Sequence, residues 1–364
     1  MARQFKWFFP LALALTINNP QQAIAGLIVN TTGEVTIRRE GFTNYTPAGV
    51  GTQIFPGDEV KPEPGTRVII LASDLTSLTV TDNSKLLSLG DLDTNKEAAK
   101  KICKNPDGTE YVCRPGPIDL TIPYIISPRH TKILKSNFTL SWNRVRSSRF
   151  YEVSIKNEGD LVWQRDTTST NILYEKDWSL QPNTPYLLVV EASNGRSSYE
   201  EIEKGAVNLG FEILDDSKIE EIEQAIYKLE DLCLPPEGET LALAHLYIGA
   251  ELRLEAIEKL KYLIDQGNLN PAVHRTLGDV YAAIGLNTFA QKVYLEAFKL
   301  ANSTKDIEEQ AATATGLSEI YQIFGNYYEA HHWLIEALQR YQELDDNERL
   351  YELTLTLERV MGLM

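Results

Sequence analysis

Residues that could perform catalysis or bind a metal are few in this sequence, and their spacing does not bring them together. His331 and His332 are adjacent, and neighbours on a helix point about 100° apart, so their rings do not converge on one metal ion. The acidic pair Asp345 and Asp346 lies at an expected helix end, where solvated charge is the ordinary explanation. No nucleophile elbow, phosphate loop, dinucleotide-binding glycine motif or His-Glu-x-x-His motif occurs. We therefore expect no enzyme, no metal site and no cofactor.

The three cysteines carry a different kind of chemistry. Cys103 and Cys113 flank an Asn-Pro-Asp-Gly turn sequence that can bring them together, and disulfides persist outside the cytoplasm. We expect a Cys103–Cys113 disulfide. Cys233 lies between two leucines and is expected to be a small buried apolar residue rather than a reactive thiol. None of the Cys and His spacings of a zinc site is present.

The first 25 residues are laid out as a secretory signal peptide. A basic start is followed by an apolar run from Trp7 to Ile17 and a small-x-small ending at Ala23 to Ala25. The run is about eleven residues long, whereas a membrane-spanning helix needs about twenty. We expect a protein that is periplasmic, secreted or attached to the cell envelope, with no membrane-spanning segment after cleavage. An uncleaved interfacial anchor is the alternative.

The negative charge of the chain is concentrated in its C-terminal part. The formal net charge is −16, and residues 211–364 contain 28 acidic and 12 basic side chains. An electrostatic field of that sign repels phosphate backbones and lacks the basic stripe on which nucleic-acid binding depends. We therefore expect no nucleic-acid partner.

Residues 26–93 combine short β-runs with Gly, Pro and Asn turns, which predicts a small all-β domain. Its motifs, in chain order, are Gly33-x-Val35-x-Ile37, Pro47-Ala48-x-x-Gly51, Gly57-Asp58-Glu59-Val60 and Gly65-x-Arg67-Val68. This order resembles the FecR-like periplasmic β-domain. In that family the Gly-Asp step turns the chain between strands, so the resemblance implies a structural role for Gly57 and Asp58. Residues 94–129 are rich in proline and are expected to be a linker that contains the disulfide loop.

Residues 130–210 predict a second β-domain. Phe138, Leu140 and Trp142 alternate with polar residues, which places one face of a strand in a core. The later run from Leu180 to Tyr186 resembles the fibronectin type III hallmark in which a Tyr hydroxyl closes a corner between strands. The resemblance implies a β-sandwich with Trp142 in its core. Trp163 has two possible roles, a second core aromatic or an exposed platform for a sugar.

Residues 211–364 have helical periodicity and repeat themselves. Three units share a small residue and, twelve residues later, an alanine, at Ala244 and Ala256, Gly278 and Ala290, and Ser318 and Ala330. The first two units are 34 residues apart and the next two 40 apart, with the extra six residues expected at the turn near Ser303 to Glu308. This pattern resembles the tetratricopeptide repeat (TPR) and implies helix pairs stacked into a solenoid. Further helices are expected before and after the three units.

In TPR folds the first helix of each unit lines a concave groove. The residues that the resemblance places in this groove are Leu241, His245, Ile248, Arg275, Asp279, Thr315, Glu319 and Gln322. A mixed polar groove in an acidic background suits a protein or peptide segment that carries basic or neutral polar groups. For each residue the alternative is an ordinary solvated helix face.

The fold class expected is therefore multidomain, all-β followed by all-α. This domain order resembles exported multidomain proteins found mainly in cyanobacteria, which implies a non-enzymatic scaffold or adaptor that binds partners through the TPR groove. One alternative is a periplasmic sensory component that acts through the FecR-like domain. Another is a glycan-binding protein of the cell envelope.

Overall fold

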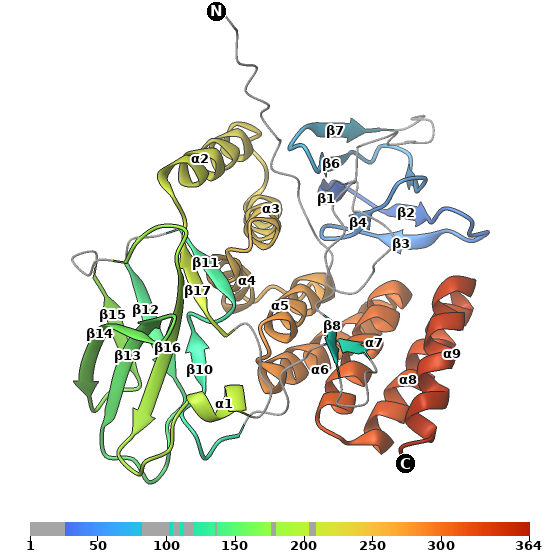
Figure 1. The fold of residues 1–364 in the computed structure, drawn as a ribbon. Coiled ribbons are helices and arrows are strands. Elements are labelled where there is room, and N and C mark those ends of the chain that lie inside the picture. The colour runs from blue at the N-terminus through green and yellow to red at the C-terminus, as the bar shows by residue number, and fades with distance from the viewer. Residues whose placement is uncertain are drawn as a thin grey trace, which may run out of the picture.

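The protein has a multidomain fold in which two β-domains precede an array of helices, as expected (Figure 1). The computed structural model describes residues 26–81, 119–134, 137–175, 180–203 and 209–364, and the backbone of residues 102–104 and 110–112. The expected signal peptide at residues 1–25 lies outside these ranges. The backbone of Cys103, in β8 (Ile102–Lys104), pairs with Tyr111 of β9 (Glu110–Val112). Cys113 is outside the described residues, so the disulfide stays a prediction.

The first β-domain consists of two small antiparallel sheets. Their strands are β1 (Gly26–Thr31), β2 (Val35–Arg38), β3 (Thr46–Ala48), β4 (Gln53–Ile54), β5 (Glu59–Pro62), β6 (Val68–Ala72) and β7 (Ser77–Val80), in the orders β4-β1-β6-β7 and β3-β2-β5. Ile28, Ile37 and Ile70 lie in the core between the sheets. At the turn before β5, Gly57 has a φ of +86°, and the Asp58 carboxylate accepts a hydrogen bond from the Phe55 backbone at 2.8 Å. Both residues therefore shape the turn.

The second β-domain is a sandwich of the immunoglobulin and fibronectin kind. Its strands are β10 (Ile125–Ser127), β11 (Thr131–Ile133), β12 (Phe138–Trp142), β13 (Tyr151–Asn157), β14 (Asp160–Thr167), β15 (Asn171–Tyr174), β16 (Pro185–Ala192) and β17 (Phe211–Ile213). The sheet β10-β12-β15 faces the sheet β11-β17-β16-β13-β14. Trp142 is buried between them. The Tyr186 hydroxyl accepts a hydrogen bond from the Gln181 backbone at 2.7 Å, which closes the corner that the sequence predicted. The sandwich begins with β10, ahead of the expected boundary at residue 130.

The helical array follows a short helix, α1 (Tyr199–Glu203). Its helices are α2 (Asp216–Asp231), α3 (Pro236–Gly249), α4 (Arg253–Asp265), α5 (Pro271–Ala283), α6 (Asn287–Thr304), α7 (Ile307–Ile323), α8 (Tyr327–Glu343) and α9 (Asn347–Met361). The three TPR-like pairs are α3 with α4, α5 with α6, and α7 with α8. A Cβ atom on Gly278 would lie 2.6 Å from the Tyr294 ring, and one on Gly316 would lie 2.8 Å from it. These two glycines therefore let α5 and α7 close around the Tyr294 ring.

Two details differ from the sequence-based expectation. The six extra residues lengthen two helices instead of forming a loop: α6 has 18 residues and α7 has 17, against 13 in both α4 and α5. Only Lys305 and Asp306 remain between α6 and α7. The expectation that Cys233 is buried was wrong. Cys233 is exposed because it follows α2 with a left-handed φ of 47°, and its neighbour Leu234 is buried instead.

No helix in the described part of the chain has both the length and the apolar character required to cross a membrane.

Candidate functional site: a cleft between the first β-domain and the helical repeats

The first β-domain is docked on the first helices of the repeats. Leu27 and Val29 of β1 belong to the same apolar core as Leu241 of α3, while Ile28 between them points into the β-domain. Both faces of β1 are therefore buried. A Cβ atom on Gly238 of α3 would lie 1.8 Å from the Val29 carbonyl oxygen, so the strand and the helix are in backbone contact.

Docking continues along α5. A Cβ atom on Gly51, whose φ is +95°, would lie 2.9 Å from the Ala272 Cβ atom. The Asn270 side-chain amide donates a hydrogen bond to the Val50 carbonyl at 2.6 Å, while its oxygen accepts from the Ala272 backbone and caps α5. One side chain thus both begins a helix and holds the β-domain.

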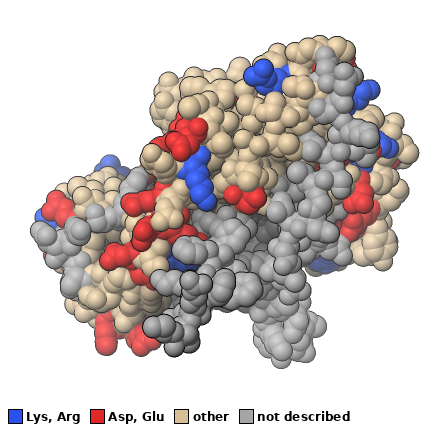
Figure 2. Space-filling view, turned by 90° about the horizontal axis from the view of Figure 1, so that it is seen from above, with Lys and Arg blue, Asp and Glu red and all other residues tan. Residues whose placement is uncertain are grey.

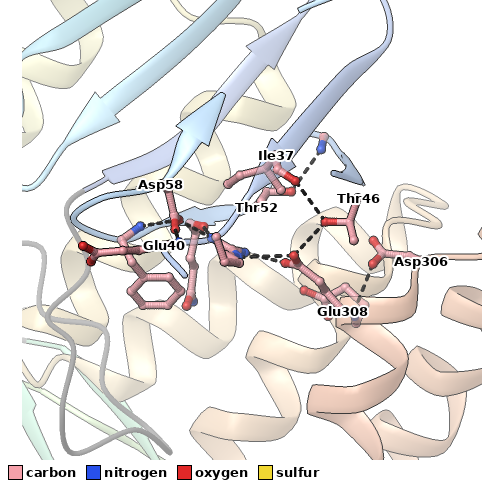
Figure 3. A network of polar contacts seen from close by, with 12 residues as sticks. Ile37, Glu40, Thr46, Thr52, Asp58, Asp306 and Glu308 are labelled. Atoms are coloured by element: carbon pink, nitrogen blue, oxygen red, sulfur yellow. Dashed lines mark hydrogen bonds and ion pairs between the residues drawn. The ribbon is translucent and has the colours of Figure 1, made fainter. Parts of the chain in front are cut away.

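A polar network joins the β-domain to α7. Arg39 Nε donates to Glu308 at 3.2 Å, and its Nη1 donates to the Gln53 carbonyl at 2.8 Å and to Asp58. The Thr46 hydroxyl donates to Glu308 at 2.8 Å, and Figure 3 shows Glu308 extending from α7 toward Thr46 and Asp58. Burial alone would lower the pKa of Arg39, but the Glu308 and Asp58 carboxylates outweigh it and raise the pKa above its ordinary value.

A second network lies beneath the first, between α5 and α7. The Arg275 guanidinium binds Glu309 through two hydrogen bonds of 2.7 and 3.0 Å, and Asp279 through one of 2.7 Å. The Tyr294 hydroxyl donates to the other Asp279 oxygen at 2.6 Å. Burial raises the pKa of Asp279 to about 6 in spite of Arg275. Arg275 therefore bridges two consecutive helix pairs.

Between the two networks and α9 lies a cleft of about 410 Å³. Phe42 and Phe55 line it from the β-domain, and Tyr341 lines it from α8. The turn before α9 closes one end, where the Asp345 carboxylate accepts hydrogen bonds from the Thr43 hydroxyl at 2.9 Å and from the Asn44 amide at 3.0 Å. The cleft is thus lined by the first β-domain, by helices α5, α7 and α8, and by the start of α9.

The groove residues predicted from the sequence fall into three groups: some line the cleft, some are buried and some are partly exposed. Arg275, Asp279 and Thr315 line the cleft. Leu241 and His245 are buried at 0% and 1% exposure. The residues with partly exposed side chains are Ile248, Glu319 and Gln322.

His245 has an unusual environment. Burial lowers its pKa to about 3, and neither ring nitrogen has a hydrogen-bond partner among the described residues. The imidazole is therefore neutral over the physiological pH range.

Sequence reasoning did not find the wall that the β-domain contributes. Two signals were present: the uninterrupted apolar run from Leu27 to Val29, which suits a strand buried on both faces, and the six-residue insertion that carries Glu308.

The sandwich is attached to the other side of the array. Arg129 binds Glu201 through two hydrogen bonds of 2.8 and 2.9 Å and donates from Nε to the Ile284 carbonyl at 2.6 Å. The Thr131 hydroxyl also bonds to the backbone of Glu251. Both acceptor carbonyls lie in turns within helix pairs, so the sandwich meets the repeats away from the cleft.

The structure weakens one of the chemical alternatives, the sugar platform. Trp163 is partly buried and packs against the sandwich core, so it does not provide an open sugar platform. Within the described ranges no group of three His, Cys, Asp or Glu side chains is placed to hold a metal ion.

No protein-family model and no curated protein sequence matches the chain. Among solved structures, BtubC (BKLC) from P. vanneervenii aligns over 40% of this chain and 64% of its own, at 17% identity and a TM-score of 0.35. This chain therefore spans slightly less than two thirds of BtubC. The TPR-like repeats of a Podosopora anserina putative kinesin light chain align over 39% of this chain and 88% of their own, at 18% identity and a TM-score of 0.28.

The fibronectin(III)-like modules of Clostridium thermocellum CbhA align over 54% of this chain and 80% of theirs, at 7% identity and a TM-score of 0.17. Likenesses of this strength carry no functional conclusion, and the fold class rests on the strands and helices themselves. The chain is a multidomain protein in which a TPR-like helical array holds two β-domains.

Proposed function

We propose that this protein is an exported, non-enzymatic scaffold that binds a protein or peptide partner in the cleft between the first β-domain and the α7–α9 region. The single observation that carries the proposal is the cleft itself. The β-domain covers α3, where Leu241 is fully buried, and a lined cavity remains beside α7. A volume of about 410 Å³ lies within the range of about 300 to 1,000 Å³ that is common for ligand sites.

The partner that suits this surface is a polypeptide. Aromatic rings such as Phe42 and Tyr341, next to buried polar groups, are the mixture that protein interfaces use. On the face that Figure 2 shows, the described Lys and Arg side chains are isolated and form no continuous basic patch. That face therefore offers little to a phosphate backbone.

Export and the identity of the first domain are part of the proposal. Export is supported by the signal-peptide layout of residues 1–25. The FecR-like assignment is supported by the order of the Gly-containing motifs, including the turn at Gly57 and Asp58.

Site-specific photocrosslinking tests the proposed function. A photoreactive phenylalanine analogue replaces Phe42, which lines the cleft, and in a control protein replaces Tyr262, which is 56% exposed on α4. We expect a polypeptide adduct from position 42 in cell-envelope and periplasmic extracts, and no adduct of the same mass from position 262. If a partner copurifies with the protein but crosslinks only at position 262, the partner binds near α4 and not in the cleft, and the proposal is wrong.

A further inference from the structure

The basic side chains of the cleft are already neutralised. Nine carboxylates and three guanidinium groups line it among the described residues. Arg39 lies between Asp58 and Glu308, and Arg275 lies between Asp279 and Glu309. The third, Arg349, contacts Glu352 outside the lining at 3.3 Å. A ligand that enters the cleft therefore finds an excess of negative charge.

Two exposed carboxylates line the cleft from different parts of the protein. Glu40 follows β2 on the β-domain and Glu348 lies in the first turn of α9, and neither forms an ion pair with any described residue. Glu40 is held over the turn at Gly57, where an added Cβ atom would lie 2.5 Å from the Glu40 carboxyl carbon. Both carboxylates thus bring negative charge to the same cleft.

The pKa values of two acids in the cleft are raised, first by burial and then by neighbouring carboxylates. Burial and the neighbouring Glu309 and Glu308 carboxylates raise the pKa of Asp306, which lines the cleft, to about 7. Burial also raises the pKa of Asp346. Carboxyls titrate this high only where nearby positive charge does not offset burial and like charge.

A separate observation points to a ligand with backbone polar groups. Thr276 lines the cleft and is only 3% exposed. A hydroxyl at the wall of a cleft can donate a hydrogen bond to a ligand and accept one from it. An amide of an extended peptide can take part in both, whereas a simple ammonium ion offers no acceptor.

We propose that the cleft recognises a lysine or arginine side chain of an extended peptide segment, with the basic group between Glu40 and Glu348 and its aliphatic stem against Phe42 and Tyr341. This inference rests on the proposed function, because it specifies the chemistry of the partner at the same site. The long apolar stem and charged end of Lys and Arg match aromatic walls with acidic edges.

Selection of random heptapeptides displayed on phage, with the full chain as bait, tests the inference. We expect Lys or Arg to be enriched at one position of the selected peptides. The double variant Glu40→Gln and Glu348→Gln should weaken the best synthetic peptide by about tenfold, as expected for two partly solvated ion pairs. Replacing the peptide's enriched basic residue by norleucine should weaken it similarly. Binding should also weaken as salt rises from 50 to 300 mM on the scale set by screening.

Glu223→Gln is the matched control, because it removes the same charge from an exposed position on α2 and should leave peptide binding unchanged. Peptides without basic enrichment, or equal weakening by the control, would overturn the inference. If such peptides still crosslink at position 42, peptide binding in the cleft is supported but recognition of a basic side chain is not. If they crosslink only at position 262, both the proposed function and this inference are wrong. If spermidine displaces the peptide when both are at the same concentration, the cleft recognises a free amine as well as it recognises a peptide, and the inference of a peptide ligand is wrong.

Discussion

Gly238 of α3 and Val29 of β1 lie in such close contact that a Cβ atom on the glycine would be 1.8 Å from the valine carbonyl oxygen. The atom in the way belongs to the backbone of β1, which pairs with β4 and with β6, and Val29 lies at the bulge in the pairing with β6. This contact makes the β-domain and the helical array one packed body at α3.

Gly238→Ala should therefore loosen docking. Alanine favours a helix over glycine by about 1 kcal/mol, so helix propensity alone predicts stabilisation, whereas overpacking costs about 1 to 3 kcal/mol. We expect the overpacking to outweigh the helix propensity, so that docking is weakened. Faster hydrogen exchange at the β1 amides measures this. Gly49→Ala is the control, because nothing lies within 4 Å of its added Cβ atom. A more stable Gly238→Ala protein with unchanged exchange would contradict backbone contact at this site.

The ion pair of Arg39 and Glu308 should contribute to docking at the other end. Their side chains are 15% and 19% exposed, so solvent screens the pair only partly. A double-mutant cycle with Arg39→Gln and Glu308→Gln should give a coupling energy of about 1 to 2 kcal/mol in the opening free energy of β1. Each single change also affects a shared partner, Asp58 or Thr46, and the cycle removes those contributions. A coupling near zero would mean that this ion pair adds nothing to docking.

The hydrogen bond between the Gln181 amide and the Tyr186 hydroxyl should stabilise the corner of the sandwich locally. Tyr186→Phe removes the acceptor of the Gln181 amide and should cost about 1 kcal/mol. We expect the Gln181 amide to exchange faster and the sandwich to melt earlier in calorimetry. Tyr199→Phe serves as control because Tyr199 is 47% exposed and its hydroxyl has no hydrogen bond to a described residue. Equal effects of the two variants would show that the corner hydrogen bond adds nothing.

The elements that could be predicted from sequence are those whose signal is local. The helix pairs follow from small residues at fixed spacing, because Ala256, Ala290 and Ala330 are each fully buried where helices cross. The corner at Tyr186 follows from a seven-residue motif. In both cases residues near in sequence determine the contact, so one sequence suffices.

The cleft could not be predicted because it depends on which surfaces meet across more than 200 residues. The apolar character of Leu27 and Val29 indicates a second buried face, yet nothing local says that α3 covers it. Likewise the insertion at residues 303–308 indicates an irregular repeat. Only the three-dimensional packing shows that it extends α7 so that Glu308 meets Arg39.

Asp306 makes the stability of the protein depend on pH. This residue caps α7 by accepting a hydrogen bond from the Glu309 backbone at 3.0 Å, and its pKa is raised to about 7, first by burial and then by the Glu309 carboxylate. An unfolded Asp titrates near about 3.9. Between these values the folded state binds more protons than the unfolded state, so this group lowers the free energy of unfolding as pH rises from about 4 to about 7.

Asp306→Asn keeps the cap, since asparagine is an equally good N-cap residue, and removes the buried charge. We expect the variant to be more stable than the original protein at pH 8, by on the order of 1 kcal/mol, and the difference to shrink at pH 5, where the folded Asp306 is already neutral. Thermal unfolding of both proteins at the two pH values and constant ionic strength measures it. Asp279, with a pKa of about 6, contributes to both proteins alike and cancels in the difference. A variant that is less stable at pH 8, or whose advantage does not change with pH, would show that Asp306 is better solvated than its position between α6 and α7 implies.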